Sequence, residues 1–259
     1  MMVTMKSIQW KATRRNWPLR LFLFELRRCI SWTWGLPPLL IGMVFVLPRY
    51  ISLYDSDDPL RYALMLRYCL ELMLPFITLT LTVPLLAREW QEGTLTQVAL
   101  RKPVFALLVL RLLYVMGYLT IWVIVGSLIV LASTRPHPEP HGNSWLWIGQ
   151  NLGIALAPSL CLAMLAQTLL LIPGNSVVGY MLGLGVWLVN MVVAPFLQGG
   201  NYRNILLYLL FSWTQRGFTD RPDDWWQGKW LLLVIALLLM LVQWKLLTDE
   251  GRFIRQSEE

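Results

Sequence analysis

The sequence VFALLVLRLLYVMGYLTIWVIVGSLIVLA, residues Val104–Ala132, decides the fold of this chain. It is apolar almost throughout and carries one charged side chain, Arg111. A helix that crosses the hydrocarbon core of a bilayer needs roughly 20 mostly apolar residues. The stretch therefore predicts a membrane-spanning helix.

The composition of the whole chain extends this prediction on both sides of the stretch. Hydrophobic residues make up 56% of the 259 positions and charged residues 14%, whereas a soluble domain carries about 25% charged residues. The chain has too few polar groups to cover its apolar surface, so lipid is expected to be its solvent. We predict an all-α integral membrane protein with a transmembrane domain over 32–248 between a cytoplasmic segment, 1–31, and a cytoplasmic tail, 249–259. The six predicted spans are Thr33–Leu47, Tyr68–Ala87, Val104–Ala132, Trp145–Ile172, Val177–Leu197 and Trp230–Leu247.

The distribution of Lys and Arg predicts the orientation of the spans. Thirteen of these residues lie before the first span, between the second and third, or at and after the end of the sixth, against seven on the other side. The positive-inside rule therefore predicts that both termini are cytoplasmic. The net charge of +7 is explained mostly by this asymmetry, so a nucleic-acid partner is not expected. The first thirty residues are too charged for a cleavable signal peptide.

Two further segments are predicted to lie at the membrane surface. Within 1–31, the positions Leu19, Phe22, Leu23, Leu26 and Ile30 share one face and predict an amphipathic interface helix. The alternative is an ordinary basic flank of the first span. Between the fifth and sixth spans, the segment 198–229 contains an apolar patch, 205–213, that is too short to cross the membrane. We predict an outer helical segment there.

The polar connection between the second and third spans has the pattern of a separate helix. Gly93 is suited to end the second span. Thr94 followed three residues later by Gln97 is a capping-box pattern. Leu95 and Val98 then share a face. These residues predict a short cytoplasmic helix at about 94–101, and the alternative is a polar turn that happens to contain a helical pattern.

The segment from Arg88 to Pro103 resembles the signature of type 2 ABC transporter permeases, the membrane subunits of ATP-driven exporters. In that family an acidic pair, a Gly-Thr-Leu sequence, a short helix and a proline follow the second span. The six spans, the interface helix and the outer segment are also similar to the family. Two features depart from it: Thr96 stands where Glu is frequent, and Pro103 lies about one residue further on. The residues of this chain that match the motif or its helix are Glu89, Glu92, Gly93, Thr94, Leu95, Gln97, Val98 and Arg101.

The resemblance implies how the protein would work and where. The helix at 94–101 would be a coupling helix that docks on a separate ABC ATPase subunit, which would bind ATP and Mg. The tight turn Pro173-Gly174-Asn175-Ser176 would be a second, weaker contact. A second permease, identical or related, would complete the pathway in a prokaryotic cell membrane. No cofactor is implied in this chain.

Motifs that carry enzyme chemistry are missing from the sequence. There is no phosphate loop, no Gly-x-Ser-x-Gly and no His-Glu-x-x-His, so we expect no catalytic residue here and ATP hydrolysis on the partner. His137 and His141 lie among prolines, which predict a stiff loop rather than a metal site. Three cysteines, Cys29, Cys69 and Cys161, share no ligand spacing.

Polar groups inside the predicted spans are candidates for the pathway or an outer gate. Charges within a membrane are costly and mark functional sites by default. Arg67 and Glu71 lie four residues apart, so they could instead form a structural pair along one helix face. Amide side chains could line a path or bond helices together. The candidates for a pathway or gate are Arg67, Glu71, Gln167 and Asn190, and the further amides are Gln150 and Asn151.

Two other features of the sequence each leave two interpretations open. Arg111 is similar to a basic residue of the permease family, or it snorkels to the membrane surface. Gly179 and Gly183 form a Gly-x-x-x-Gly motif that predicts close packing, either within the chain or in a dimer. For the function as a whole, the alternatives to a permease are an integral membrane enzyme acting on lipid or peptide, and a non-transporting scaffold or immunity protein.

Overall fold

A computed structural model describes residues 30–50, 61–91, 104–134, 142–172, 175–197 and 222–248. These residues are almost entirely helical and contain no strand, which confirms the all-α prediction. The predicted interface helix, the coupling helix at 94–101, the apolar patch at 205–213 and the tail lie outside the described residues, except that Ile30 is described. The elements are a 3-10 helix η1 (Trp32–Gly35) and the α-helices α3 (Leu36–Tyr50), α4 (Arg61–Gln91), α6 (Val104–Ser133), α7 (Ser144–Leu171), α8 (Ser176–Leu197) and α11 (Pro222–Thr248).

Four of these helices are long and apolar enough to cross a membrane. Their qualifying ranges are Arg61–Leu85, Val104–Ser133, Ser144–Leu171 and Trp226–Thr248. The apolar parts of α3 and α8 are shorter, at Trp32–Val46 and Val177–Val189. The structure therefore supports a membrane protein with four long apolar helices, and a spanning role for α3 and α8 stays a prediction.

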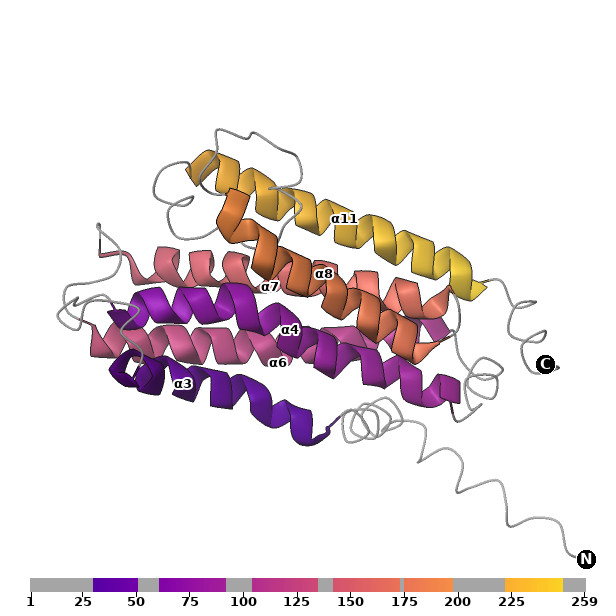
Figure 1. The fold of residues 1–259 in the computed structure, drawn as a ribbon, viewed down its shortest axis with the longest axis horizontal. Helices are drawn as coiled ribbons and strands as arrows, with labels where there is room; N and C mark the ends of the chain where they lie inside the picture. The colour runs from indigo at the N-terminus through magenta and orange to yellow at the C-terminus, as the bar shows by residue number, and fades with distance from the viewer. Residues whose placement is uncertain are drawn as a thin grey trace, which may run out of the picture.

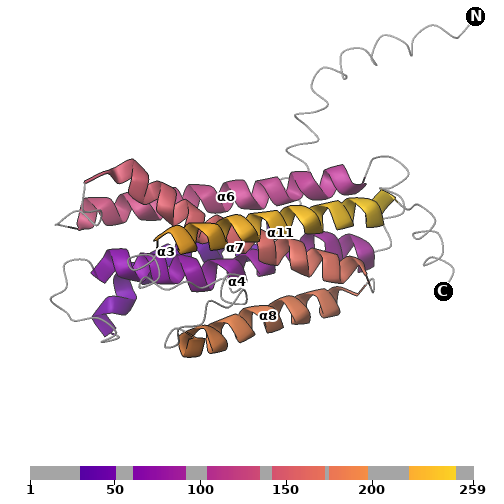
Figure 2. The ribbon, with the colours of Figure 1, turned by 90° about the horizontal axis from the view of Figure 1, so that it is seen from above.

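Consecutive helices run in opposite directions along one common axis (Figures 1 and 2). The helices α4, α7 and α11 begin at the left end of Figure 1, where α3, α6 and α8 finish. We call this end the outer end, following the orientation predicted from Lys and Arg, and the opposite end the inner end. As a consequence, α4, α7 and α11 are parallel to one another.

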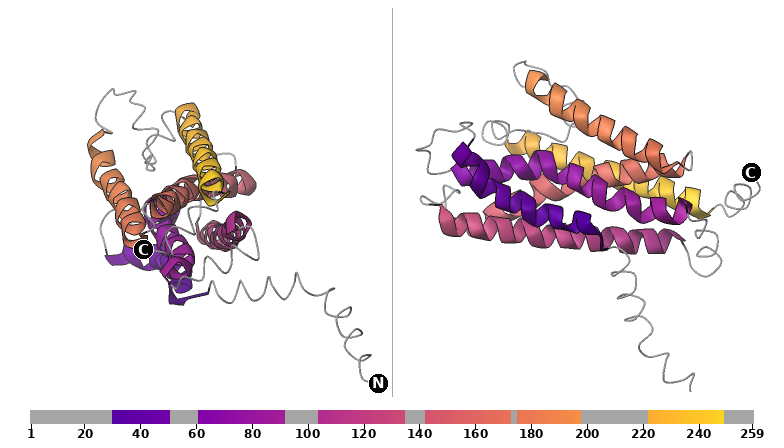
Figure 3. Two further views of the ribbon diagram at one scale, coloured as in Figure 1. Left: turned by 90° about the vertical axis from the view of Figure 1, so that its right-hand side faces the viewer. Right: turned by 60° about the horizontal axis from the view of Figure 1, so that its bottom comes forward.

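The helix α7 lies at the centre of the bundle and packs against α4, α6, α8 and α11 (Figure 3, left). Within their most apolar windows, 78% of α7 and 67% of α4 are buried, but only 33% of α6 and 22% of α11. The outward faces of α6 and α11 carry large apolar side chains such as Leu113, Ile121, Leu237 and Leu241. In a membrane protein these faces would meet lipid.

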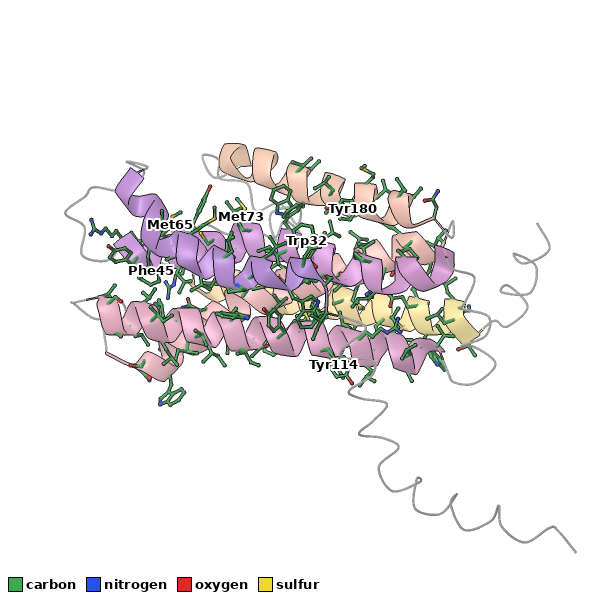
Figure 4. All side chains as sticks on the ribbon, turned by 90° about the horizontal axis from the view of Figure 1, so that it is seen from below. Trp32, Phe45, Met65, Met73, Tyr114 and Tyr180 are labelled. Atoms are coloured by element: carbon green, nitrogen blue, oxygen red, sulfur yellow. The ribbon has the colours of Figure 1, made fainter. Side chains whose placement is uncertain are left out.

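The interior is formed by two groups of buried apolar side chains. One joins α3, α4, α6 and the first part of α7, and includes Met65 with Phe45 packed against it (Figure 4). The other joins α4, α6, the second part of α7 and α11, with Tyr180 of α8 packed against it. Each long helix therefore contributes to a shared core.

Two glycines explain how α8 approaches its neighbours. A Cβ atom on Gly179 would lie 2.7 Å from Leu170 Cβ and 2.8 Å from the carbonyl oxygen of Ala166. A Cβ atom on Gly183 would lie 2.7 Å from Leu79 Cδ1 and 3.1 Å from Ala166 Cβ. The Gly-x-x-x-Gly motif therefore packs α8 against α7 and α4 within the chain.

The helix α11 begins earlier than the sequence predicted. We expected a span from Trp230 preceded by an outer segment reaching residue 229, but α11 begins at Pro222. Proline at the first helical position, followed by Asp223 and Asp224, is typical of a helix start. Residues 222–229 therefore belong to α11, and this changes the position of Lys229. Likewise, α4 begins at Arg61 rather than Tyr68.

Candidate functional site

A polar cluster inside the bundle begins with Arg67 of α4. Its Nη2 atom donates a hydrogen bond of 2.6 Å to Gln150 Oε1, and its Nε atom donates one of 3.3 Å to Asn151 Oδ1. The guanidinium also lies over the ring of Trp147, 5.8 Å from its centroid. All three partners belong to α7, so Arg67 binds two parallel helices together.

The cluster continues from α7 to α6 through Asn151. This side chain is fully buried, and its Nδ2 atom donates a hydrogen bond of 3.0 Å to Ser127 Oγ. Its carbonyl oxygen receives the bond from Arg67, so both ends of the amide are used. This supports the helix-bonding interpretation of Asn151, since buried amides need such partners.

A buried ion pair joins α4 to α11 beside this network. The Nζ atom of Lys229 lies 3.7 Å from Glu71 Oε1. Glu71 is 7% exposed and Lys229 is 5% exposed, so the pair is removed from solvent. Glu71 is one helical turn from Arg67 on α4, so charges of both signs lie about 6 Å apart along the axis of this helix.

Lys229 is the functional candidate that sequence reasoning missed. We counted it as a cation of the outer connection, because that connection was predicted to extend to residue 229. The helix-start pattern at Pro222 is the signal that could have placed it inside α11. Arg67 and Glu71 were candidates for a pathway or gate, with a structural pair along one helix face as the alternative, and the structure shows that each side chain reaches a second helix.

Proline residues interrupt α4 and α7 at matching positions below the cluster. Arg67 is hydrogen-bonded to Gln150. Pro75 follows Arg67 along α4 by the same number of residues as Pro158 follows Gln150 along α7. Because the two helices are parallel, both prolines lie at about the same depth. Proline has no backbone N–H and removes one helical hydrogen bond. The carbonyls affected are those of Glu71 and Ile154.

The helix α8 contacts α4 at this proline level. The indole Nε1 of Trp187 donates a hydrogen bond of 2.7 Å to the carbonyl oxygen of Leu72. The rings of Trp187 and Phe76 have centroids 4.9 Å apart. The interrupted part of α4 is therefore supported from one side by an aromatic residue of α8.

Below the prolines, towards the inner end, two buried polar side chains bind backbone oxygens. Arg111 of α6 is 5% exposed and its Nη1 atom donates to Leu85 O at 2.8 Å. The snorkelling interpretation of Arg111 is therefore wrong, because the guanidinium faces α4 inside the bundle. Gln243 of α11 donates through Nε2 to Met164 O at 2.9 Å and to Thr168 Oγ1 at 3.0 Å.

The other predicted site residues are not part of the cluster. Gln167 of α7 is 2% exposed, and its Oε1 atom has no hydrogen-bond partner among the described residues. Asn190 lies in α8 and Glu89 in the last turns of α4, but their side chains are not described. The remaining coupling residues fall outside the described ranges: Glu92, Gly93, Thr94, Leu95, Gln97, Val98 and Arg101.

The cluster consists of groups that hold helices together by charge and hydrogen bonds. In the part of the chain that the structure describes, no three His, Cys, Asp or Glu side chains gather as metal ligands. The buried thiols of Cys69 and Cys161 are free. Comparison with protein-family models, with curated proteins and with solved structures finds no match.

Proposed function

We propose that this chain is the permease subunit of an ATP-driven ABC exporter, with both termini in the cytoplasm of a prokaryotic cell. One observation carries the proposal: α4 finishes at the same end of the bundle at which α6 begins (Figure 1). The connection with the permease-like motif, Arg88–Pro103, therefore starts and finishes at that end. The same holds for the turn between α7 and α8, so two connections are available to one ATPase on this side.

The length of α4 suits it to transmit motion from that end. Its 31 residues extend about 46 Å at 1.5 Å per residue, which exceeds the hydrocarbon core of about 30 Å. The same helix carries Arg67 and Glu71 in its outer half. When ATP brings two ATPase subunits together, a displacement at the inner end of α4 would move the inner part of this helix relative to the cluster in its outer half.

Purification and hydrolysis assays test the proposal. We expect this chain to co-purify with an ATPase that contains a phosphate loop and is encoded beside it, and we expect transport to depend on ATP. The variants Glu92→Lys and Gly93→Trp should insert into the membrane, while transport per ATP hydrolysed falls. Glu250→Lys reverses a charge in the predicted cytoplasmic tail outside the motif and is the matched control.

Three outcomes separate the proposal from its alternatives. Full coupling in both motif variants would contradict the docking assignment. A stable complex with an ATPase that never moves a substrate would indicate a scaffold or immunity protein. Chemical turnover of lipid or peptide by the chain alone would indicate a membrane enzyme.

A further inference from the structure

We infer that Glu71 and Lys229 form an ionic latch that closes the outer end of the bundle above a hinge at Pro75 and Pro158. The latch rests on the proposed function only for its role in transport, because the contacts that define it belong to this chain alone. We assign this role to Lys229 of α11, which holds the outer part of α4 through its ion pair with Glu71.

The hinge follows from the matching prolines of two parallel helices. Each proline removes a helical hydrogen bond at the same depth, which makes that level of α4 and α7 easier to bend than a continuous helix. Above this level, Arg67 bonds α4 to Gln150 and Asn151 of α7. The outer parts of α4 and α7 are therefore joined, and we expect them to move together.

The helix α11 has no proline after Pro222, so it is an uninterrupted helix beside the two proline-containing helices α4 and α7. Below the hinge, Gln243 fixes α11 to α7 by two hydrogen bonds at 2.9 and 3.0 Å. Above the hinge, the Glu71–Lys229 pair links α11 to the outer part of α4. The helix α11 is therefore held to α7 below the hinge and to α4 above it. If only the contact above the hinge separates, the outer end of the bundle opens.

An ion pair suits the outer contact for a physical reason. The attraction between two buried charges is largely offset by the loss of their hydration, so the net stability of such a pair is small. If the outer end opens and admits water, each ion regains hydration. The pair itself therefore separates at a modest cost in free energy, and a force at the inner end can change the populations of the closed and open states.

Two native thiols make the latch testable in the full chain. Cys69 lies on α4 above the hinge, Cys161 lies on α7 below it, and both are buried and free. Each is studied alone, with the other two cysteines replaced by Ser or Ala. The measurement is the rate of labelling in vesicles by a membrane-impermeant maleimide applied from the outer side.

The double variant Glu71→Gln with Lys229→Met removes both charges of the pair, and Arg67 keeps its bonds to Gln150 and Asn151. We expect it to fold and to label Cys69 about tenfold faster than the native pair does, because labelling follows the population of the open state. Labelling of Cys161 should stay unchanged. The exchanged pair Glu71→Lys with Lys229→Glu should slow the labelling of Cys69 again, but less than fully, because the new ammonium lies one turn from Arg67.

Two results would overturn the latch. In one, Cys69 in the folded double variant labels as slowly as in the native chain. In the other, Cys69 and Cys161 accelerate equally, which indicates general loosening of the bundle. A separate experiment repeats the labelling with the ATPase and ATP present. If nucleotide does not change the labelling rate there, while Cys69 still labels faster in the double variant, the proposed function is contradicted and the latch is supported.

Discussion

Two contacts within this bundle hold helices together by opposite means. Between α7 and α8, Gly179 and Gly183 bring the backbones so close that an added Cβ atom would overlap its neighbours. Between α4 and α11, Glu71 and Lys229 meet as buried charges. The first contact depends on the close fit of apolar groups, and separating it leaves a void between the helices. The second can be hydrated when it separates. We therefore expect movement at the charged contact and rigidity at the glycine contact.

Removing one member of the ion pair should give the largest loss of stability. Lys229→Met leaves the Glu71 carboxylate buried without its ammonium, and breaking a buried pair in this way costs about 3 kcal/mol or more. The measurement is the unfolding free energy in one fixed detergent. Lys245→Met is the control, because Lys245 is exposed on the same helix. Equal effects of the two variants would show that the pair contributes nothing specific.

Overpacking the glycine contact should give the next largest effect. Gly183→Leu pushes α8 against Leu79 of α4 and Ala166 of α7, and inserting such volume into a packed interior costs about 2 kcal/mol. Gly185→Leu is its control, since a Cβ atom on Gly185 meets nothing within 4 Å. Stability of both variants is measured in the same detergent. If Gly185→Leu proves as harmful as Gly183→Leu, the close approach of α8 is not what stabilises the contact.

The hydrogen bond between α6 and α7 should give the smallest effect. Ser127→Ala removes the acceptor of Asn151 Nδ2, and hydrogen bonds between membrane helices contribute about 0.6 kcal/mol on average. Ser133→Ala, on the same helix, removes an exposed hydroxyl bonded to Ile129 O within its own helix. A double-mutant cycle with Asn151→Ala measures the coupling. A coupling energy of zero would exclude this bond from the polar cluster.

The sequence predicted the helices better than it predicted their partners. Apolar runs located α6, α7 and α8 within a residue or two of their observed bounds, because burial in lipid leaves a continuous signal along the chain. The Glu71–Lys229 pair left no such signal. Whether two side chains of distant helices meet depends on how each helix is rotated about its axis, which a single sequence does not specify.

The candidate site was therefore predicted only in part. Arg67 and Glu71 stood out because charges are rare within spans, and both belong to the observed cluster. Lys229 was assigned to a connection because the start of α11 was placed eight residues too late. Gln150 and Asn151 were recognised as polar, but their bonds to Arg67 depend on the parallel packing of α4 and α7.

The most direct test of the proposed coupling is a photo-cross-link from the predicted cytoplasmic helix. A photoreactive amino acid is placed at Gln97, and at Asn143 near the outer start of α7 as the control. If the proposed function holds, we predict that Gln97 captures an ATPase subunit encoded beside this chain and that Asn143 does not. Absence of that product from Gln97, or equal capture from both positions, would contradict the account.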